Sequence, residues 1–127
     1  MGQQQILLLV VAAIVVILAI AIGIDMFAAN AQSSNRESIV SELNNLSTLA
    51  IQFYKKSSSY GGGNLSFKSW SIPEAMDTTS NGIYSLTCTD QTATITALGR
   101  EIGDNGSTLI EMVAEVTSSG IGITIIN

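Results

Sequence analysis

An uninterrupted apolar segment close to the first residue constrains this chain more than any other feature. Residues 6–24 read ILLLVVAAIVVILAIAIGI, and 14 of these 19 residues are isoleucine, leucine or valine. As a helix, such a segment rises about 28 Å, close to the roughly 30 Å hydrocarbon core of a bilayer. Each isoleucine, leucine or valine favours membrane insertion by about 0.3 to 0.6 kcal/mol. The segment therefore predicts a helix that can span a membrane.

The rest of the chain is long enough for one small domain and carries no basic patch. About 100 residues follow the apolar segment, which suffices for a single hydrophobic core. The net charge is −5, and the acidic excess predicts a solubilising surface. The basic residues are scattered along the chain at Arg36, Lys55, Lys56, Lys68 and Arg100. We therefore expect no nucleic-acid partner.

The composition also argues against catalysis. The chain has no histidine, the commonest general base and metal ligand. Its single cysteine, Cys88, cannot form an intrachain disulfide, and we expect a small buried side chain in a strand. Glu111 and Glu115 fall on one predicted strand, about 13 Å apart along it, too far for a catalytic carboxylate pair. We expect no enzymatic activity and no catalytic, cofactor or metal site.

The segment Asp104–Ser107, with Glu101 nearby, has two interpretations. Its oxygens suit calcium, but the ligand number of a recognised calcium loop is missing. A polar hairpin turn is the expected structure. The run Gly61–Gly63 lacks the following helix and lysine of a phosphate-binding loop, so we expect a flexible break there.

An amphipathic helical pattern follows the apolar segment without an intervening proline. An apolar stripe recurs at spacings of four and three residues, at Ile39, Leu43, Leu46, Ala50 and Phe53. Lys55 and Lys56 suit the C-terminal end of a helix, and the sequence SSSYGGG after them breaks it. A continuous helix to residue 56 is about 80 Å long, more than a domain of this size can bury.

The remaining residues read as a connection followed by strands. The connection contains Tyr60, Phe67 and Trp70, which we expect to anchor it on the domain core. Apolar and polar residues then alternate in four runs, at 83–89, 92–98, 109–116 and 121–126, with a polar loop at 100–107. These runs predict an antiparallel meander whose apolar face covers the helical stripe.

The predicted fold is α+β, with a long N-terminal α-helix packed against a C-terminal four-stranded antiparallel β-sheet. We divide the chain into a hydrophobic helix (1–28), its amphipathic continuation (29–56), a connecting loop (57–82) and an antiparallel β-sheet head (83–127). A secretory signal peptide is the alternative for the first part, because AANAQ at 28–32 offers a cleavage site before Gln32. The uncharged start MGQQQ and the longer apolar run favour a retained segment.

In its order of elements and in the sequence MGQQQILLLVVAAIVVILAIAIGIDMF, the chain resembles the type IV pilin superfamily. That family includes major pilins, secretion pseudopilins and their archaeal relatives. The resemblance implies a structural subunit that crosses the cytoplasmic membrane once before it joins an extracellular filament, a fimbrium, at the cell surface. It also implies a prepilin peptidase and a pilus assembly machinery as partners, and a role in cell adhesion.

The resemblance further implies a processed N-terminus. Family members lose a short basic leader that ends in glycine, and their new first residue is N-methylated. Met1 is that residue if the leader is already removed, whereas Gln3 is first if cleavage follows Gly2. Bacterial pilins carry a glutamate as the fifth residue, where this chain has Gln5. An amide still accepts a hydrogen bond from a neighbour's terminal amine, without the charge attraction. The family's mid-helix proline and paired cysteines are missing.

The expected function is self-assembly, with the apolar helices of identical subunits bundled at the filament centre. Lipid and a helix bundle are similar solvents for aliphatic side chains, and small residues such as Ala12, Ala19 and Ala21 allow close approach. The residues expected to make bundle and N-terminal contacts are Met1, Gln3, Gln4, Gln5, Ile6, Leu9, Ala13, Ile17, Gly23 and Phe27. Two alternatives are a pseudopilin or minor pilin of a secretion or DNA-uptake system, and a membrane-anchored binding domain that does not polymerise.

Asn64 and Asn105 begin N-x-S sequences in segments that we expect to be exposed, so they are candidate glycosylation sites. Asn45 begins a third such sequence within the amphipathic helix. Chance matches are expected in a chain this rich in asparagine and serine, and an unmodified chain is the alternative.

Overall fold

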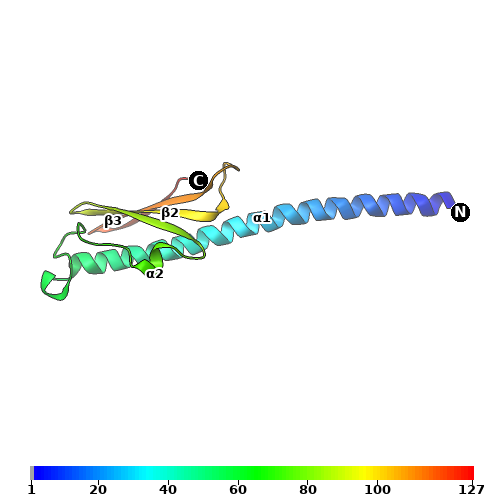
Figure 1. The fold of residues 1–127 in the computed structure, drawn as a ribbon. Helices are drawn as coiled ribbons and strands as arrows, with labels where there is room; N and C mark the ends of the chain where they lie inside the picture. The colour runs from blue at the N-terminus through cyan, green and yellow to red at the C-terminus, as the bar shows by residue number, and fades with distance from the viewer. Residues whose placement is uncertain (1) are drawn as a thin grey trace. The chain divides into compact units, whose positions relative to one another are not determined.

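The computed structural model describes residues 2–127 and contains one long helix followed by a four-stranded sheet (Figure 1). Helix α1 spans Gly2–Lys55. The chain forms two compact units, of which the first ends at Ala31 and the second is Gln32–Asn127. We call the second unit the head. The two units share α1, and each is described separately below.

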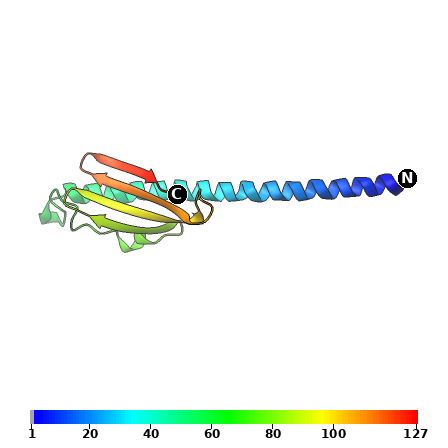
Figure 2. The same ribbon diagram turned by 90° about the horizontal axis from the view of Figure 1, so that it is seen from above.

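The sheet of the head is an antiparallel meander. Its strands are β1 (Gly82–Cys88), β2 (Thr92–Ile102), β3 (Leu109–Thr117) and β4 (Gly120–Ile125). They lie side by side in the order β1-β2-β3-β4, across the part of α1 that belongs to the head (Figure 2). The predicted α+β fold is therefore confirmed.

The core of the head lies between the inner face of the sheet and one stripe of α1. Strands β2 and β3 alternate between buried and more exposed residues, as a half-buried sheet requires. The fully buried apolar residues of α1 and of these two strands are Ile39, Leu43, Leu46, Ala50, Ala93, Ile95, Ala97, Ile110, Met112, Ala114 and Val116. Four members of the predicted stripe are thus buried, whereas Tyr54 takes the place expected for Phe53, which is only partly buried.

Polar contacts hold α1 against β2 where that strand is irregular. The pairing of β2 with β3 shifts register between Leu98 and Ile102, and the sequence prediction of a loop from residue 100 was wrong, since the strand continues to Ile102. The buried Asn35 side chain accepts hydrogen bonds from the backbone N–H groups of Arg100 (3.0 Å) and Glu101 (3.4 Å). Asn35 therefore satisfies the donors that the irregular segment turns toward the helix.

Close approach of the helix to β2 depends on Gly99. A Cβ atom at this position would lie 2.5 Å from Asn35 Oδ1 and 2.9 Å from Ile39 Cδ1. Both atoms belong to α1, so any larger residue would push the helix away from the strand.

Backbone groups of the following turn satisfy the C-terminal end of α1. The N–H groups of Gly63 and Leu65 donate to the carbonyls of Phe53 (2.8 Å) and Tyr54 (2.7 Å). This return of the chain places Asn64 and Leu65 at positive φ, 49° and 67°. Carbonyls that a helix end leaves without partners are thus paired, at the cost of a left-handed backbone at two non-glycine residues.

The connection between α1 and the sheet contains two short helices, the 3-10 helix η1 (Ser58–Tyr60) and helix α2 (Glu74–Asp77). Phe67 and Trp70 are buried as expected, and the Phe67 ring stacks on Tyr54 with ring centroids 4.6 Å apart. The expectation that Tyr60 is a third anchor was wrong, because its side chain is 77% exposed. η1 lies in the turn beyond the end of α1, away from the core residues.

Strand β4 forms one edge of the sheet. Ile121, Ile123 and Ile125 pair with inward-facing residues of β3, so they share the inner face. Ile121 and Ile125 are nevertheless exposed, because they lie at the edge of the covered area. The strand contains no charged residue and no proline that would protect a free edge.

Candidate functional site

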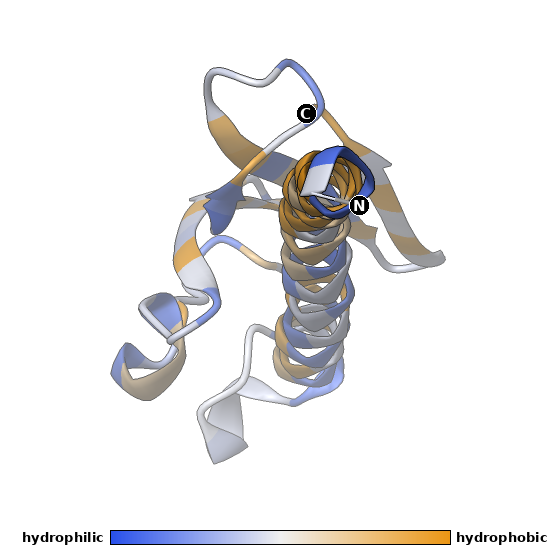
Figure 3. Ribbon diagram, turned by 90° about the vertical axis from the view of Figure 1, so that its right-hand side faces the viewer, coloured by the Kyte–Doolittle hydropathy of each residue, from blue (hydrophilic) through white to orange (hydrophobic). Residues whose placement is uncertain are grey.

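The apolar segment of α1 is the strongest candidate for a functional site, because its own unit leaves it uncovered. From Gly2 to Asn30 no residue is buried. The large apolar side chains of this stretch are between 49% (Val11) and 78% (Phe27) exposed. α1 is long and apolar enough to cross a membrane once, by length and composition. Figure 3 shows the corresponding change from apolar to mixed residues along the helix.

Five of the ten predicted contact residues lie along one face of this helix. Ile6, Leu9, Ala13 and Ile17 follow one another at spacings of three, four and four residues, which places them on a single stripe. Phe27 falls on the same stripe further along. These side chains point away from the helix axis toward open space. Exposure of so many aliphatic groups to water is unfavourable, so lipid or another protein chain is needed to cover them.

Small residues form a second, adjacent stripe. Ala12, Ala19 and Gly23 lie within about 40° of one another around the helix, and Gln5 falls on the same side. A Cβ atom at Gly23 would meet no other atom within 4 Å. Packing within one chain therefore does not require a glycine at this position. Small positions without an internal reason are those that let a second helix approach closely.

Beside Gly23 the surface has a shallow apolar hollow. It is lined by Ile20, Gly23, Ile24, Phe27 and Ala28. The first four stand at positions i, i+3, i+4 and i+7, the arrangement that receives a side chain from a facing helix in knobs-into-holes packing. The hollow can therefore hold a bulky aliphatic group of a neighbour.

The glutamines at the start of α1 do not converge on one another. Gln3, Gln4 and Gln5 are consecutive and exposed, so their side chains point about 100° apart around the helix. Only Gln5 shares a side with the small residues. Met1, the predicted methylation site, lies outside the described residues.

Comparison with known proteins finds no matching protein-family model, no similar curated protein and no similar solved structure. The candidate site is therefore defined by geometry and composition alone.

The head contains a polar cluster that the sequence did not reveal. The Glu42 carboxylate accepts hydrogen bonds from the hydroxyls of Tyr84 and Thr79 (3.0 Å for Thr79) and from the Asn81 amide (2.9 Å). Burial alone would raise the pKa of Glu42, but these donors outweigh it and lower the pKa below its usual value. Burial and the neighbouring carboxylate raise the pKa of Tyr84. The cluster joins α1 to β1 and to the segment before it.

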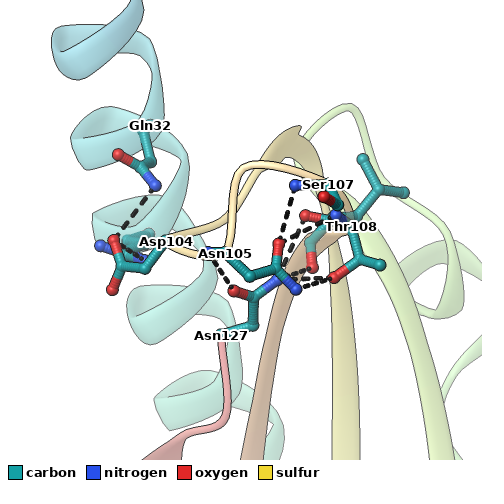
Figure 4. Close-up of polar contacts among 8 residues, drawn as sticks. Gln32, Asp104, Asn105, Ser107, Thr108 and Asn127 are labelled. Atoms are coloured by element: carbon teal, nitrogen blue, oxygen red, sulfur yellow. Dashed lines mark hydrogen bonds and ion pairs between the residues drawn. The ribbon is translucent and has the colours of Figure 1, made fainter.

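Asp104–Ser107 forms the predicted hairpin turn between β2 and β3 (Figure 4). Asn105 Oδ1 accepts hydrogen bonds from the N–H groups of Ser107 (2.9 Å) and Thr108 (3.0 Å). Asp104 pairs with Arg36 at 2.9 Å. Among residues 2–127 no group of three acidic, cysteine or histidine side chains is placed to hold a metal ion.

The other predicted residues take ordinary structural places. Cys88 is half-buried on the inner face of β1, and burial raises the pKa of its thiol. Glu111 and Glu115 alternate with the buried residues of β3, so both lie on the outer face. Both predicted glycosylation sites, Asn64 and Asn105, are exposed, and Asn105 uses its side-chain amide within the hairpin turn (2.7 Å to Thr108 Oγ1).

Proposed function

We propose that this chain is the structural subunit of an extracellular type IV pilus-like filament. Its partners are identical copies of itself, and the filament forms when the apolar segments of α1 bundle at the centre. Before assembly each copy waits in the cytoplasmic membrane as a single-span protein and is processed by a prepilin peptidase. The pilus assembly machinery then extracts it. The heads form the outer wall of the filament.

One observation carries this proposal: the apolar part of α1 is uncovered, while the head already has a complete core of its own. The buried residues of the head begin at Asn35, and the apolar segment ends at Ile24. A membrane alone would satisfy the aliphatic side chains, but it does not account for Ala12, Ala19 and Gly23 on one side of the helix. Close helix–helix contact accounts both for the uncovered aliphatic side chains and for the small residues on one side.

The physical basis of assembly is an exchange of one apolar environment for another. Lipid tails and neighbouring aliphatic helices solvate leucine, isoleucine and valine about equally well. Extraction therefore loses little if identical helices replace lipid at the same time. The uncharged Gln5 supports this exchange, because a buried amide needs only a hydrogen-bond partner, whereas a buried carboxylate also needs a counter-charge.

Electron microscopy of material sheared from the cell surface, with an antibody against the head, tests this proposal. Long filaments labelled along their whole length are expected. Retention of the chain in the membrane fraction without filaments would contradict the proposal and favour a non-polymerising anchor. Trace amounts in a mixed complex would instead favour a pseudopilin.

Mass spectrometry of the natural N-terminus provides an independent test. An N-methylated Met1, or a methylated Gln3, is expected from processing by a prepilin peptidase. A chain that begins at Gln32 would have lost the apolar segment and would contradict assembly through it.

A further inference from the structure

The end of the head beyond α1 presents an exposed, basic and partly apolar surface, which we call the basic tip. It consists of Lys55, Lys56, Tyr60, Leu65 and Lys68. All five are exposed, and the side chains of Tyr60 and Leu65 are 77% and 61% exposed. Asp90 is the acidic residue beside them, where its carboxylate accepts a hydrogen bond from Ser66. The tip therefore combines an excess of positive charge with two large apolar groups.

The backbone fixes Leu65 in this exposed position. Its N–H donates to the carbonyl of Tyr54 at 2.7 Å, and its carbonyl accepts a hydrogen bond from the Gln91 side chain at 3.3 Å. With φ at 67°, the residue adopts a left-handed conformation that leucine rarely takes. An apolar side chain held outward by a rigid turn loses little entropy when a partner covers it.

The outer face of the sheet carries an apolar patch near the other end of the head. Ile83 pairs with Leu98, and Leu98 pairs with Glu111, so these three residues form a row across the outer face. Ile126 extends this row, since its N–H donates to the carbonyl of Glu111. With Ile102 nearby, we call Ile83, Leu98, Ile102, Glu111 and Ile126 the outer patch. Its four apolar side chains are between 40% and 57% exposed.

The charge around the outer patch is opposite to that of the basic tip. Outward positions of β3 carry Glu111 and Glu115, and the outward positions of β1, of β2 up to Leu98 and of β4 carry no charged residue. Arg100 at the end of β2 directs its guanidinium to the carbonyl of Thr79, at 3.2 Å. The three lysines of the tip thus match a face whose ionised groups are glutamates.

One head cannot bring its own tip and patch together. The turn with Tyr60 follows the end of α1, whereas Ile83 and Leu98 lie at the opposite end of the sheet (Figures 1 and 2). A second copy of the chain supplies the missing partner for each surface. Because tip and patch differ, the contact is of the head-to-tail kind, which leaves one tip and one patch free after every addition.

We propose that the basic tip of one copy docks on the outer patch of a second copy, with Tyr60 and Leu65 against the isoleucines and the lysines against Glu111 and Glu115. This inference rests on the proposed filament function and names the contact between neighbouring heads. Each patch is small compared with a stable dimer interface. Bundling of α1 raises the effective concentration of the heads, so a weak contact suffices.

Disulfide cross-linking of the full chain tests the contact. Cys88→Ala removes the single native thiol. In that background, Tyr60→Cys combined with Leu98→Cys is expected to give a ladder of covalent oligomers when oxidised, both in filaments and at high density in lipid vesicles. The matched control combines Tyr60→Cys with Ser41→Cys, which is also exposed but lies on α1, outside the outer face of the sheet. A ladder no stronger than this control would overturn the proposal.

Charge reversal provides a second test of the same contact. Lys55→Glu with Lys56→Glu is expected to lower the cross-linking yield roughly threefold or more, the effect of two exposed ion pairs. Adding Glu111→Lys with Glu115→Lys to the same chain is expected to restore it. Glu74→Lys with Asp77→Lys in α2 is the control and leaves the yield unchanged. An unchanged yield after the lysine reversal, or no restoration by the compensating pair, would overturn the docking.

These results separate the docking from the filament proposal. Filaments without the Tyr60–Leu98 cross-link overturn the docking alone. Vesicle-bound chains that form the ladder without ever forming filaments support the docking and contradict the filament function. A glycan on Asn64 in assembled material would also overturn the docking, since it would occupy the tip beside Leu65.

Discussion

The buried Asn35 side chain links α1 to β2 and to the segment before β1. Its amide nitrogen donates to the carbonyl of Asn81 at 2.8 Å, while its oxygen accepts from the two N–H groups of β2. We expect Asn35→Ala to lower the free energy of unfolding by about 3 kcal/mol, because buried backbone groups lose their partners. Urea denaturation of the chain in detergent micelles measures this change.

The matched control for Asn35→Ala is Asn44→Ala, which makes the same substitution at an exposed asparagine of the same helix. Its side chain lies on the solvent side of α1, and we expect a change within about 0.5 kcal/mol. Equal effects of the two substitutions would contradict the role assigned to Asn35.

Glu42 makes the stability of the head depend on acid pH. Its pKa is lower in the folded state than its ordinary value of 4.5, so the folded chain binds fewer protons than the unfolded chain in that range. The stabilisation is present above pH 4.5 and is lost as the pH falls through the folded pKa. We expect the stability difference between the native chain and Glu42→Gln to be large at neutral pH and to shrink in acid.

Urea midpoints of both chains, measured at neutral and at acid pH, check this expectation. Glu37→Gln is the control, since Glu37 is exposed on the same helix near Glu42, and its effect is expected to be small at both pH values. A difference between the Glu42 variant and the native chain that does not vary with pH would contradict the expected linkage.

At the scale of elements, the small-residue stripe of α1 makes a prediction about assembly. Ala19→Leu with Gly23→Leu places two large side chains on the stripe and prevents close approach of a second helix, so we expect filaments to be lost. Membrane insertion should be kept, because leucine favours the bilayer. Ala21→Leu is the control. Ala21 was predicted from the sequence to be among the small residues for close approach, but it lies about 160° around the helix from both positions and so falls outside the stripe. Filament yield by electron microscopy and membrane fractionation measure the two properties. Loss of filaments in both variants would argue against a specific stripe.

In the turn after α1, Leu65 is expected to lower the stability of the head while it strengthens the proposed contact between heads. Leu65→Gly removes the left-handed strain at φ 67°, and we expect the head to gain about 0.5 to 1 kcal/mol. The same substitution removes an apolar group of the basic tip, so the cross-linking yield between heads falls. Urea denaturation and the cross-linking assay, applied to one variant, measure both effects. A Leu65→Gly chain that is less stable than the native chain would contradict the backbone strain assigned to Leu65.

Elements with a strong period were predictable from the sequence, and their junctions were not. The stripe from Ile39 to Ala50 and the four alternating strands follow from side-chain burial, which sequence periodicity reports directly. The extension of β2 to Ile102 depends instead on Asn35, which contacts it across 65 residues of sequence. Glu42 is unexceptional in its local sequence, and its partners Thr79 and Tyr84 lie 37 and 42 residues away along the chain. Long-range polar contacts of this kind have no periodic signature.

At the scale of the whole molecule, the head has a core of its own. Within residues 2–127, every buried residue lies between Asn35 and Val116. We expect the fragment 32–127 to fold by itself, with a stability of about 5 to 10 kcal/mol, typical of a domain of this size. It should be monomeric at low concentration and form no pili, because the proposed contact between heads is weak without the proposed helix bundle.

Size-exclusion chromatography with light scattering and urea denaturation of that fragment check this prediction. A fragment that is unfolded would show that the first unit stabilises the head. Pilus-like filaments of the fragment alone would show that the apolar segment is not the assembly element.

The free edge of β4 has a consequence for anyone who stores or images isolated heads. Uncharged strands rich in isoleucine and glycine add to one another through their backbone groups, and β4 has no side chain that blocks such stacking. Old preparations should therefore accumulate amyloid-like fibres that resemble pili in negative stain. Fibre diffraction distinguishes the two, because stacked strands repeat at about 4.7 Å along the fibre whereas bundled helices give the 5.4 Å pitch.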